Sequence, residues 1–306
     1  MGNDKYQELI LLSTEELITR ANIVRRDNIG NVLEMCSVIN AKSGSCSEDC
    51  KFCAQSAHHC VNIQEYSLKS EEDIISASQK AVENGAGRFG IVTSGNKLTK
   101  NEINSIASAI KQILEEVDIE MCASLGALDT EAFTVLKDAG LTRYHHNIET
   151  SERFYPEIVS THDFSERINT IRNAKEAGME VCSGGIFGMG ETWQDRLDMA
   201  VILKELEVDS VPINFLVPID GTPFAGAETI SPIDAVRSIA IFRIILEHVA
   251  IKVAAGRESV LKDFQGMMFN AGANGMMIGG YLTVTGRPPE EDRILISEIK
   301  KLWNNE

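Results

Sequence analysis

The segment CSEDCKFC, residues 46–53, places Cys46, Cys50 and Cys53 in a CxxxCxxC array. Three thiolates this close together can face one soft metal centre from a single loop, and soft thiolate ligands favour iron–sulfur clusters or zinc. Structural zinc normally has paired ligands, and no second CxxC or HxxxH follows at zinc-finger spacing. The array therefore predicts an iron–sulfur cluster. Three incidental thiols or a disulfide are the alternative, and a disulfide is disfavoured in a chain without an export signal.

The residue before the third cysteine is aromatic. With Phe52 in that place, the array resembles the signature of the radical S-adenosylmethionine superfamily. This resemblance implies a 4Fe-4S cluster held by three cysteines, with one iron left open to chelate the amino and carboxylate groups of S-adenosylmethionine.

Around this segment the chain alternates apolar runs with amphipathic ones. Ser70 reads as a helix N-cap, Thr99 with Glu102 as a capping box, and Ser231 with Pro232 as a further helix start. We expect a helix at 258–268 before the eighth strand, and a further amphipathic helix after that strand. The expected strands lie at 31–40, 88–95, 118–124, 142–149, 179–188, 210–217, 250–257 and 274–280.

Regular alternation of this kind predicts a parallel (β/α)8 barrel, because parallel neighbours require crossover helices. We expect one domain over residues 1–306, with an N-terminal helical extension at 1–30, the barrel at 31–285 and a C-terminal helix at 286–306. No internal repeat or low-complexity linker indicates a second domain.

Composition narrows the partners. The chain has 306 residues, 43% of them hydrophobic, and a formal net charge of -16. No uninterrupted apolar run of about 18 residues is present, so we expect no membrane span. The excess of acidic residues argues against nucleic-acid partners, whose phosphates need Lys and Arg. The start of the sequence has no basic segment followed by a hydrophobic one, and we expect a cytoplasmic protein.

Other cysteines lie on predicted strands. Cys36 falls on the first strand, Cys122 on the third and Cys182 on the fifth, while Arg257 falls at the end of the seventh. Active sites of such barrels lie at the C-terminal strand ends. One cysteine alone is more often a small buried hydrophobe, but three on barrel strands predict a second metal centre.

Longer segments resemble the biotin synthase family over roughly residues 32–292. They are SGSCSEDCKFCAQS, MCASLGALD, YHHNIETSERFY, ERINTIRNAKEAGMEVCSGGIFGMGET, SVPINFLVPIDGTP, AAGRE and FNAGANGMMIGGYLTVTGRPPEED. The resemblance implies a full barrel with a 4Fe-4S cluster, S-adenosylmethionine, dethiobiotin and an auxiliary iron–sulfur cluster that donates sulfur. The implied activity is radical insertion of sulfur into dethiobiotin.

The auxiliary site departs from the family pattern. That pattern has three cysteines and an arginine around a 2Fe-2S cluster, and Gly90 stands where one cysteine is usual. Cys122, Cys182 and Arg257 match the remaining ligands, and Cys36 stands where a serine is usual. We infer a rebuilt site in which Cys36 replaces the missing ligand, and in which Gly90 and Gly275 make room for a cluster other than 2Fe-2S. Cys60 is either a further ligand or a surface thiol.

The resemblance also implies the contacts to small molecules. Asn147 and Glu149 correspond to the pair that holds the methionine amine and the ribose hydroxyls, and Arg167 to the arginine that meets the carboxylate. Gly188 and Val217, with Phe52, belong to the same cofactor pocket. For dethiobiotin, Asn214 matches a contact to the ureido ring, and His145 stands where the family has asparagine.

The implied partners are dethiobiotin, a reductant of the flavodoxin or ferredoxin type and a second copy of the chain in a homodimer. Two other readings stay open. A sister radical enzyme acting on another small molecule is favoured by His145, and a non-enzymatic iron–sulfur or zinc electron carrier would have no use for Asn147, Glu149 and Arg167.

Overall fold

The strands form one closed parallel sheet. The computed structural model describes residues 4–304, so the outermost residues of the two expected extensions, 1–3 and 305–306, lie outside the described part. The strands found there are β1 (Glu34–Lys42), β2 (Arg88–Thr93), β3 (Glu120–Ser124), β4 (Arg143–His145), β5 (Glu180–Cys182), β6 (Gly185–Phe187), β7 (Ser210–Phe215), β8 (Ala250–Val253) and β9 (Gly275–Met277). Their order is β5-β4-β3-β2-β1-β9-β8-β7-β6, and a β5–β7 pairing closes the circle.

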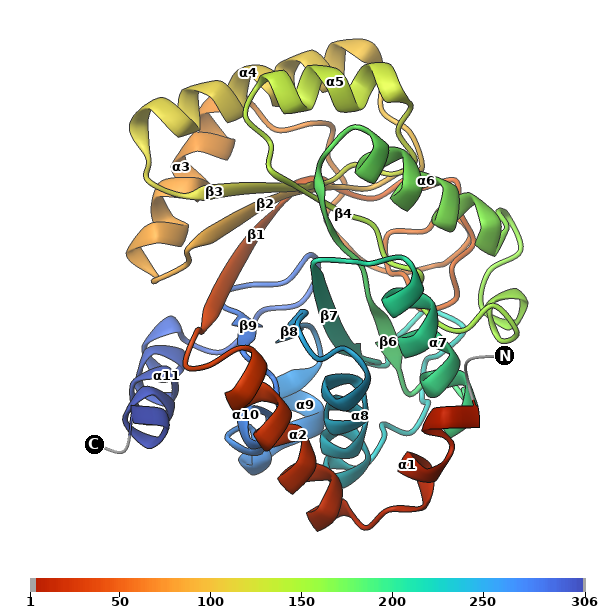
Figure 1. The fold of residues 1–306 in the computed structure, drawn as a ribbon. Coiled ribbons are helices and arrows are strands. Elements are labelled where there is room, and N and C mark those ends of the chain that lie inside the picture. The colour runs from red at the N-terminus through yellow and green to blue at the C-terminus, as the bar shows by residue number, and fades with distance from the viewer. Residues whose placement is uncertain (1–3, 305–306) are drawn as a thin grey trace.

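Because β5 and β6 are two halves of one interrupted strand, the nine strands found fill eight positions. The predicted (β/α)8 barrel is therefore confirmed (Figure 1). The structure gives the helices as η1 (Asp4–Tyr6), α1 (Glu8–Leu11), α2 (Thr14–Asn28), α3 (Glu71–Glu83), α4 (Lys100–Glu116), α5 (Thr130–Asp138), η2 (Tyr155–Glu157), α6 (Phe164–Glu176), α7 (Trp193–Glu205), α8 (Pro232–Ile245), α9 (Arg257–Leu261), η3 (Lys262–Phe264), α10 (Met267–Asn270) and α11 (Pro289–Asn304).

The predicted helix starts are confirmed by their caps. The side chain of Ser70 accepts a hydrogen bond from the Asp73 N–H at the start of α3. Thr99 and Glu102 form the complete capping box of α4. Each such cap satisfies backbone N–H groups that have no partner within the helix, which is worth about 1 kcal/mol.

Several expected elements differ from the structure. The strand expected at 179–188 is divided into β5 and β6, and the one expected at 250–257 ends at Val253. The single helix expected at 258–268 is broken into α9, η3 and α10, because Lys262 takes a left-handed conformation with φ 48° that ends α9. The expected strand 142–149 stops at His145. Beyond it the pairing with the β5–β6 segment becomes irregular, since the Ile148 and Glu149 N–H groups both donate to the Gly184 carbonyl, and Glu149 has a positive φ, 67°.

The register of the barrel decides which inward-facing residues share a layer. From Cys36, ladder pairs lead across β2 to β3, where Cys122 lies two residues further along. The same step leads from Cys122 to Cys182, from Cys182 to Lys252, and from Lys252 back to Cys36. Four steps of two residues give the shear of eight that is typical of this barrel, in which alternate strands supply four side chains to each layer.

The C-terminal helix α11 packs against the end of α2, while the two chain ends lie at opposite sides of the view in Figure 1. In the same figure, α2 runs beside α8. The guanidinium of Arg25 on α2 lies 3.8 Å from the ring centroid of Trp303 on α11. No helix in residues 4–304 is long and apolar enough to cross a membrane.

The break between β5 and β6 depends on close backbone approach. A Cβ atom on Gly184 would lie 2.0 Å from the Pro212 carbonyl oxygen, and one on Gly185 would lie 2.1 Å from that of Glu149. Only glycine allows this approach without moving a neighbouring strand or the loop after β4.

We predict that Gly185→Ala lowers the free energy of unfolding by about 1–3 kcal/mol, because the added methyl group overlaps backbone atoms that cannot rotate away. Gly87→Ala is the matched control, since a Cβ there meets nothing within 4 Å, and it should change stability by less than about 0.5 kcal/mol. Denaturant unfolding of both variants measures the difference. Equal stability of the two would contradict the steric explanation.

Candidate active site

One chamber of about 730 Å³ lies at the C-terminal ends of the strands. Its lining contains the six cysteines of both predicted metal sites, namely Cys36, Cys46, Cys50, Cys53, Cys122 and Cys182. It also contains seven of the residues predicted to bind small molecules, namely Phe52, His145, Asn147, Glu149, Arg167, Asn214 and Val217. The structure thus brings together residues from segments 36–53, 122–182 and 214–217.

The first cysteine set lies on the long loop between β1 and α3. The Cys53 N–H donates to the Cys50 carbonyl at 2.9 Å, and the Cys46 N–H donates to the Gln55 carbonyl at 3.0 Å, so the loop folds tightly on itself. Burial raises the pKa of Cys53 to about 11 and that of Cys50 further. A bound metal centre offsets such a penalty, because it stabilises the thiolate.

The ligand spacing does not suit a single ion. Across the described residues, no group of three or more His, Cys, Asp and Glu side chains could hold one metal ion. A four-iron cube separates its thiolate ligands more widely than a single zinc ion does. Three thiols around one chamber therefore fit the cluster better than the zinc alternative.

The second cysteine set is one barrel layer. Cys36, Cys122 and Cys182 project from alternate strand positions, and the register makes Lys252 the fourth member of their layer. Burial, with the neighbouring Cys182, raises the pKa of Cys122 to about 12. For Lys252, burial alone would lower the pKa, but Cys36, Cys182 and Glu34 outweigh it and raise the pKa.

Buried cations surround this layer. The Lys252 ammonium donates to Glu34 at 2.8 Å, and the Arg143 guanidinium reaches the same carboxylate at 3.3 Å. The side chains of Arg88, Arg143 and Lys252 are 8%, 6% and 5% exposed, and all three line the chamber. Their carboxylate partners are Glu34, Glu120 and Glu180. Cationic groups beside thiols favour the thiolate form that binds soft metals.

The two glycines of the predicted rebuilt site have different surroundings. Gly90 lines the chamber, and a Cβ there would lie 3.1 Å from Val38. Gly275 is not part of the lining. A Cβ on Gly275 would lie 2.4 Å from the Glu34 carbonyl oxygen and 3.0 Å from Cγ of Lys252, so the space that it leaves is taken by Lys252.

Three predicted site residues lie elsewhere. Arg257 is fully buried outside the chamber lining, and its guanidinium pairs with Asp292 at 2.7 Å. It follows β8 as the first residue of α9, so its side chain does not share the strand layer. Cys60 is exposed on the loop after the cluster array and is likewise outside the lining. Gly188 is also outside it, and its N–H donates to the Glu191 carboxylate at 2.9 Å.

The chamber wall after β4 carries the predicted cofactor contacts. The Asn147 side-chain amide donates to the Glu149 carboxylate at 3.3 Å and accepts from the Gly184 N–H at 3.0 Å. Burial raises the pKa of Glu149, and Arg167, whose guanidinium lies 3.8 Å away, opposes the rise. Glu149, which is part of the chamber wall, has a backbone conformation with positive φ, and this conformation costs about 1–3 kcal/mol.

His145 on β4 and Asn214 on β7 both line the chamber. Burial lowers the pKa of His145 to about 4, so the ring is neutral at neutral pH and offers one donor and one acceptor. The Asn214 amide donates to the Gly185 carbonyl at 3.1 Å and accepts from the Ala255 N–H at 3.1 Å. Asn214 therefore joins neighbouring strand ends and retains only part of its hydrogen-bonding capacity for a ligand.

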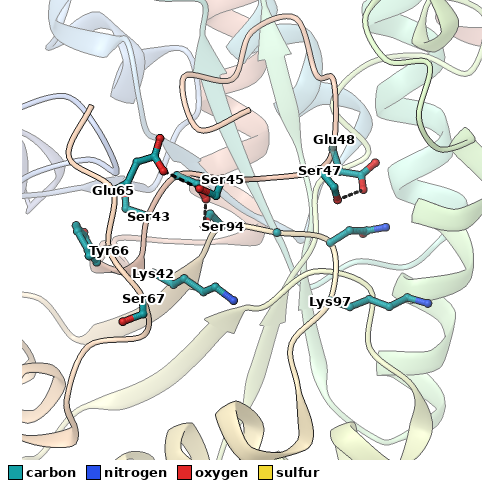
Figure 2. A pocket seen from close by; sticks show the side chains of 13 residues that line it. Lys42, Ser43, Ser45, Ser47, Glu48, Glu65, Tyr66, Ser67, Ser94 and Lys97 are labelled. Atoms are coloured by element: carbon teal, nitrogen blue, oxygen red, sulfur yellow. Dashed lines mark hydrogen bonds between the residues drawn. The ribbon is translucent and has the colours of Figure 1, made fainter. Parts of the chain in front are cut away.

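A second, polar cleft of about 690 Å³ opens behind the cluster loop (Figure 2). It shares Glu48, Ser94, Gly95 and Asn96 with the chamber lining. Figure 2 shows the Glu65 carboxylate turned toward the Ser45 hydroxyl, which donates to it at 2.6 Å. Solvent can therefore reach the cluster loop from the side as well as through the chamber.

Comparison with known proteins now decides the family. Residues 42–203 match the radical SAM superfamily, and residues 212–300 match the biotin and thiamin synthesis associated domain. The chain is 49% identical over 299 residues to biotin synthase of Thermotoga petrophila, covering 97% of this chain and 99% of the relative. It is 47% identical to biotin synthase of Geobacter sulfurreducens, with 98% and 92% covered. The chain belongs to the biotin synthase family.

Solved structures agree on the fold. Methylornithine synthase superposes with a TM-score of 0.77 at 22% identity, over 90% of this chain and 81% of that one. The FeFe-hydrogenase maturase of Carboxydothermus hydrogenoformans gives 0.79 at 20% identity, over 93% and 71%. At such identities the likeness concerns the barrel alone, and the biotin synthase family assignment depends on the sequence relatives.

Sequence reasoning missed the charged residues of this biotin synthase family member. Arg88, Arg143 and Lys252 are inward-facing residues of strands, and an ion in a predicted strand interior is a signal in itself. Lys252 lies in the apolar run AIKV, where a charge stands alone. A count of strand register would have selected Lys252 rather than Arg257.

We predict that Cys60→Ser retains the iron and sulfide content and the activity of the parent protein, because Cys60 lies outside the chamber. Chemical iron and sulfide counts on the anaerobically purified variant check this. Loss of about four irons per chain, one whole cube, would place Cys60 among the ligands. A substitution of Arg257 does not test metal binding cleanly, because removing one partner of a buried ion pair itself destabilises the protein.

Proposed function

We propose that this chain inserts sulfur into dethiobiotin to form biotin, with S-adenosylmethionine as the source of the radical. The observation that carries the proposal is the presence of two separate cysteine sets in one chamber. One set lies on the CxxxCxxC loop and the other on the barrel strands. A simple electron carrier needs no such chamber, and it needs no carboxylate, amide and guanidinium in the wall between the two sets.

The loop set supplies three thiolates for a 4Fe-4S cluster, and the donor chemistry fits that group. When bound, this cluster supplies the electron that cleaves S-adenosylmethionine to methionine and a 5'-deoxyadenosyl radical, and an auxiliary cluster supplies the sulfur. Asn147 and Glu149 then hold the amine and the ribose hydroxyls, and Arg167 binds the carboxylate. Phe52 and Val217, which also line the chamber, provide apolar contacts.

The strand set supplies Cys36, Cys122 and Cys182 for the auxiliary cluster. We place Lys252 beside it as a cationic neighbour, in the position that sequence reasoning gave to Arg257. The proposal of a cluster other than the usual 2Fe-2S depends on the altered positions, because Gly90 stands where the family pattern has a cysteine and Cys36 where it has a serine. The surrounding cations balance the negative charge of thiolates and sulfide.

Dethiobiotin would occupy the chamber between the two cysteine sets. It would contact His145 and the hydrogen-bonding groups of Asn214 that are not used by the protein. Hydrogen abstraction needs no acid or base from the protein. The work of the chain is to hold the reacting carbon near the radical and the sulfide, and to keep competing hydrogens away. His145, in place of an asparagine, also leaves a second candidate, a sister enzyme acting on a different small molecule.

The remaining partners are proposals as well. An electron donor of the flavodoxin or ferredoxin type, a homodimer and a cytoplasmic location agree with a reduced, thiol-rich chain. The cleft of Figure 2 offers one side on which solvent, and hence a donor, comes near the cluster loop.

We expect Cys46→Ala to abolish formation of 5'-deoxyadenosine, whereas Cys36→Ser should retain it and lose biotin formation. The reason is that the two sets bind separate clusters and that a serine hydroxyl is a poor ligand for soft iron. Parallel assays of 5'-deoxyadenosine and biotin, with Mössbauer spectra, separate the two effects. Full auxiliary iron and full biotin yield in Cys36→Ser would refute the rebuilt site.

Lys252→Met should weaken the auxiliary site selectively, because it removes a cation from the cysteine layer while keeping the side-chain volume. Lys252→Arg is the matched control, since it keeps the charge. Auxiliary iron and sulfide should fall in the Met variant and be retained in the Arg variant, with the radical cluster unchanged in both. Equal iron and sulfide contents in the two would show that Lys252 acts only in packing.

A further inference from the structure

His162 connects the cluster loop to Arg167. Its Nδ1 lies 2.7 Å from Oε2 of Glu48, which stands between Cys46 and Cys50 in the array. Its Nε2 lies 3.0 Å from Nη2 of Arg167. The imidazole is buried, with 8% of the residue exposed. One ring thus joins a carboxylate of the cluster loop to the guanidinium in the chamber wall.

The direction of these hydrogen bonds follows from their donors. A guanidinium has only donors, so Nε2 of His162 must accept from Arg167, and Nδ1–H must donate to Glu48. The ring is therefore neutral and in the Nδ1–H tautomer. Burial and the nearby Arg167 lower the pKa of His162, which agrees with a neutral ring.

The rest of the guanidinium is also held. Nε of Arg167 donates to the Tyr155 hydroxyl at 3.1 Å, and Nη1 lies 3.5 Å from the Asn147 carbonyl oxygen. Arg167 nevertheless lines the chamber, so its remaining N–H groups are free to meet a ligand there. Such an arrangement fixes the plane of the guanidinium, which determines whether it can bind a carboxylate with two hydrogen bonds.

The two loops are latched at a second point. The Thr161 hydroxyl donates to Glu48 at 2.6 Å, and Asp49 accepts from the Ser160 N–H at 2.9 Å. The Ser160 hydroxyl also bonds Asp49. The Asp49–Ser160 bonds hold the two loops without involving Glu48, His162 or Arg167, so they provide a control for purely structural effects.

We propose that His162 is a positioning residue, and that the Glu48–His162–Arg167 relay orients Arg167 to bind the carboxylate of S-adenosylmethionine. The inference rests on the proposed function, in which Arg167 makes that contact. The relay also makes the geometry of the carboxylate site depend on the loop that carries the cluster cysteines, since Glu48 is part of that loop.

The first test is the tautomer of His162. In protein labelled with 15N-histidine, the His162 signals should report a protonated Nδ1 and an unprotonated Nε2 at neutral pH. The chain has six histidines, and His162→Gln assigns the signals. A protonated Nε2, in either a neutral or a cationic ring, overturns the relay.

The second test measures S-adenosylmethionine binding through the change in the electron paramagnetic resonance spectrum of the reduced protein. His162→Phe should weaken binding about tenfold, as expected for losing the alignment of a charge-assisted hydrogen bond. The KM should rise with kcat nearly unchanged, because the contact is made in ground and transition states alike. His162→Gln can accept from Arg167 and donate to Glu48, and it should bind within about threefold of the parent.

Three variants make the outcome decisive. Ser160→Ala removes one bond of the second latch and should leave the affinity unchanged. Arg167→Ala should weaken binding at least as much as His162→Phe, and His162→Phe should add nothing in the Arg167→Ala background.

An unchanged affinity in Arg167→Ala refutes the proposed role of Arg167. A weakened Arg167→Ala beside an unaffected His162→Phe, or equal losses in the Phe and Gln variants, refutes the relay alone. If the His162→Phe variant takes up no iron, its affinity for S-adenosylmethionine is not comparable with that of the parent. The tautomer of His162 in the parent protein then decides whether the relay exists.

Discussion

The pairing register of the closed sheet is the constraint on which the rest of the structure depends. Parallel strands with a shear of eight supply four inward side chains to each layer, one from every second strand. In this chain one layer is Cys36, Cys122, Cys182 and Lys252. A slip of one residue in any strand would turn its member of the layer outward. The separation of the three cysteine backbones is therefore set by the hydrogen bonds between strands.

That layer is stable only because its charges are matched. Burying a cation costs several kcal/mol unless a partner compensates it, and Lys252, Arg143 and Arg88 are each bonded to a carboxylate at the edge of the barrel. Those carboxylates are more exposed than the cations that they pair with. The cationic partners of these pairs thus lie inside the barrel and the carboxylates at its more exposed edge, in a chain whose formal net charge is -16. Such a pocket suits thiolates and sulfide while the outer surface repels polyanions.

The sequence predicted most of this architecture, and the limits of that prediction have physical reasons. Strand and helix alternation, caps such as Ser70, and the CxxxCxxC array depend on local patterns, which a sequence shows directly. Arg257 was proposed for the auxiliary site because it follows a strand and matches the family's ligand pattern. Its direction depends on register and on the start of α9, which only pairing across the barrel determines. Contacts such as that of His162 with Glu48 join segments more than 100 residues apart, and no local sequence pattern predicts them.

The two cysteine sets are held by different kinds of interaction, and this difference bears on their distance from each other. The strand set is part of the sheet. The loop set instead lies on a segment after β1. Its contacts with the rest of the barrel include the bonds that Glu48 and Asp49 make with residues 160–162 and the bond from the Lys51 N–H to the Ile158 carbonyl. A radical reaction tolerates little misplacement of the reacting centres. The gap that a substrate must bridge is therefore fixed on one side by the barrel and on the other by these few hydrogen bonds. Among the described contacts, the latch between the cluster loop and residues 160–162, which precede α6, is where small changes would alter the chemistry without unfolding the protein.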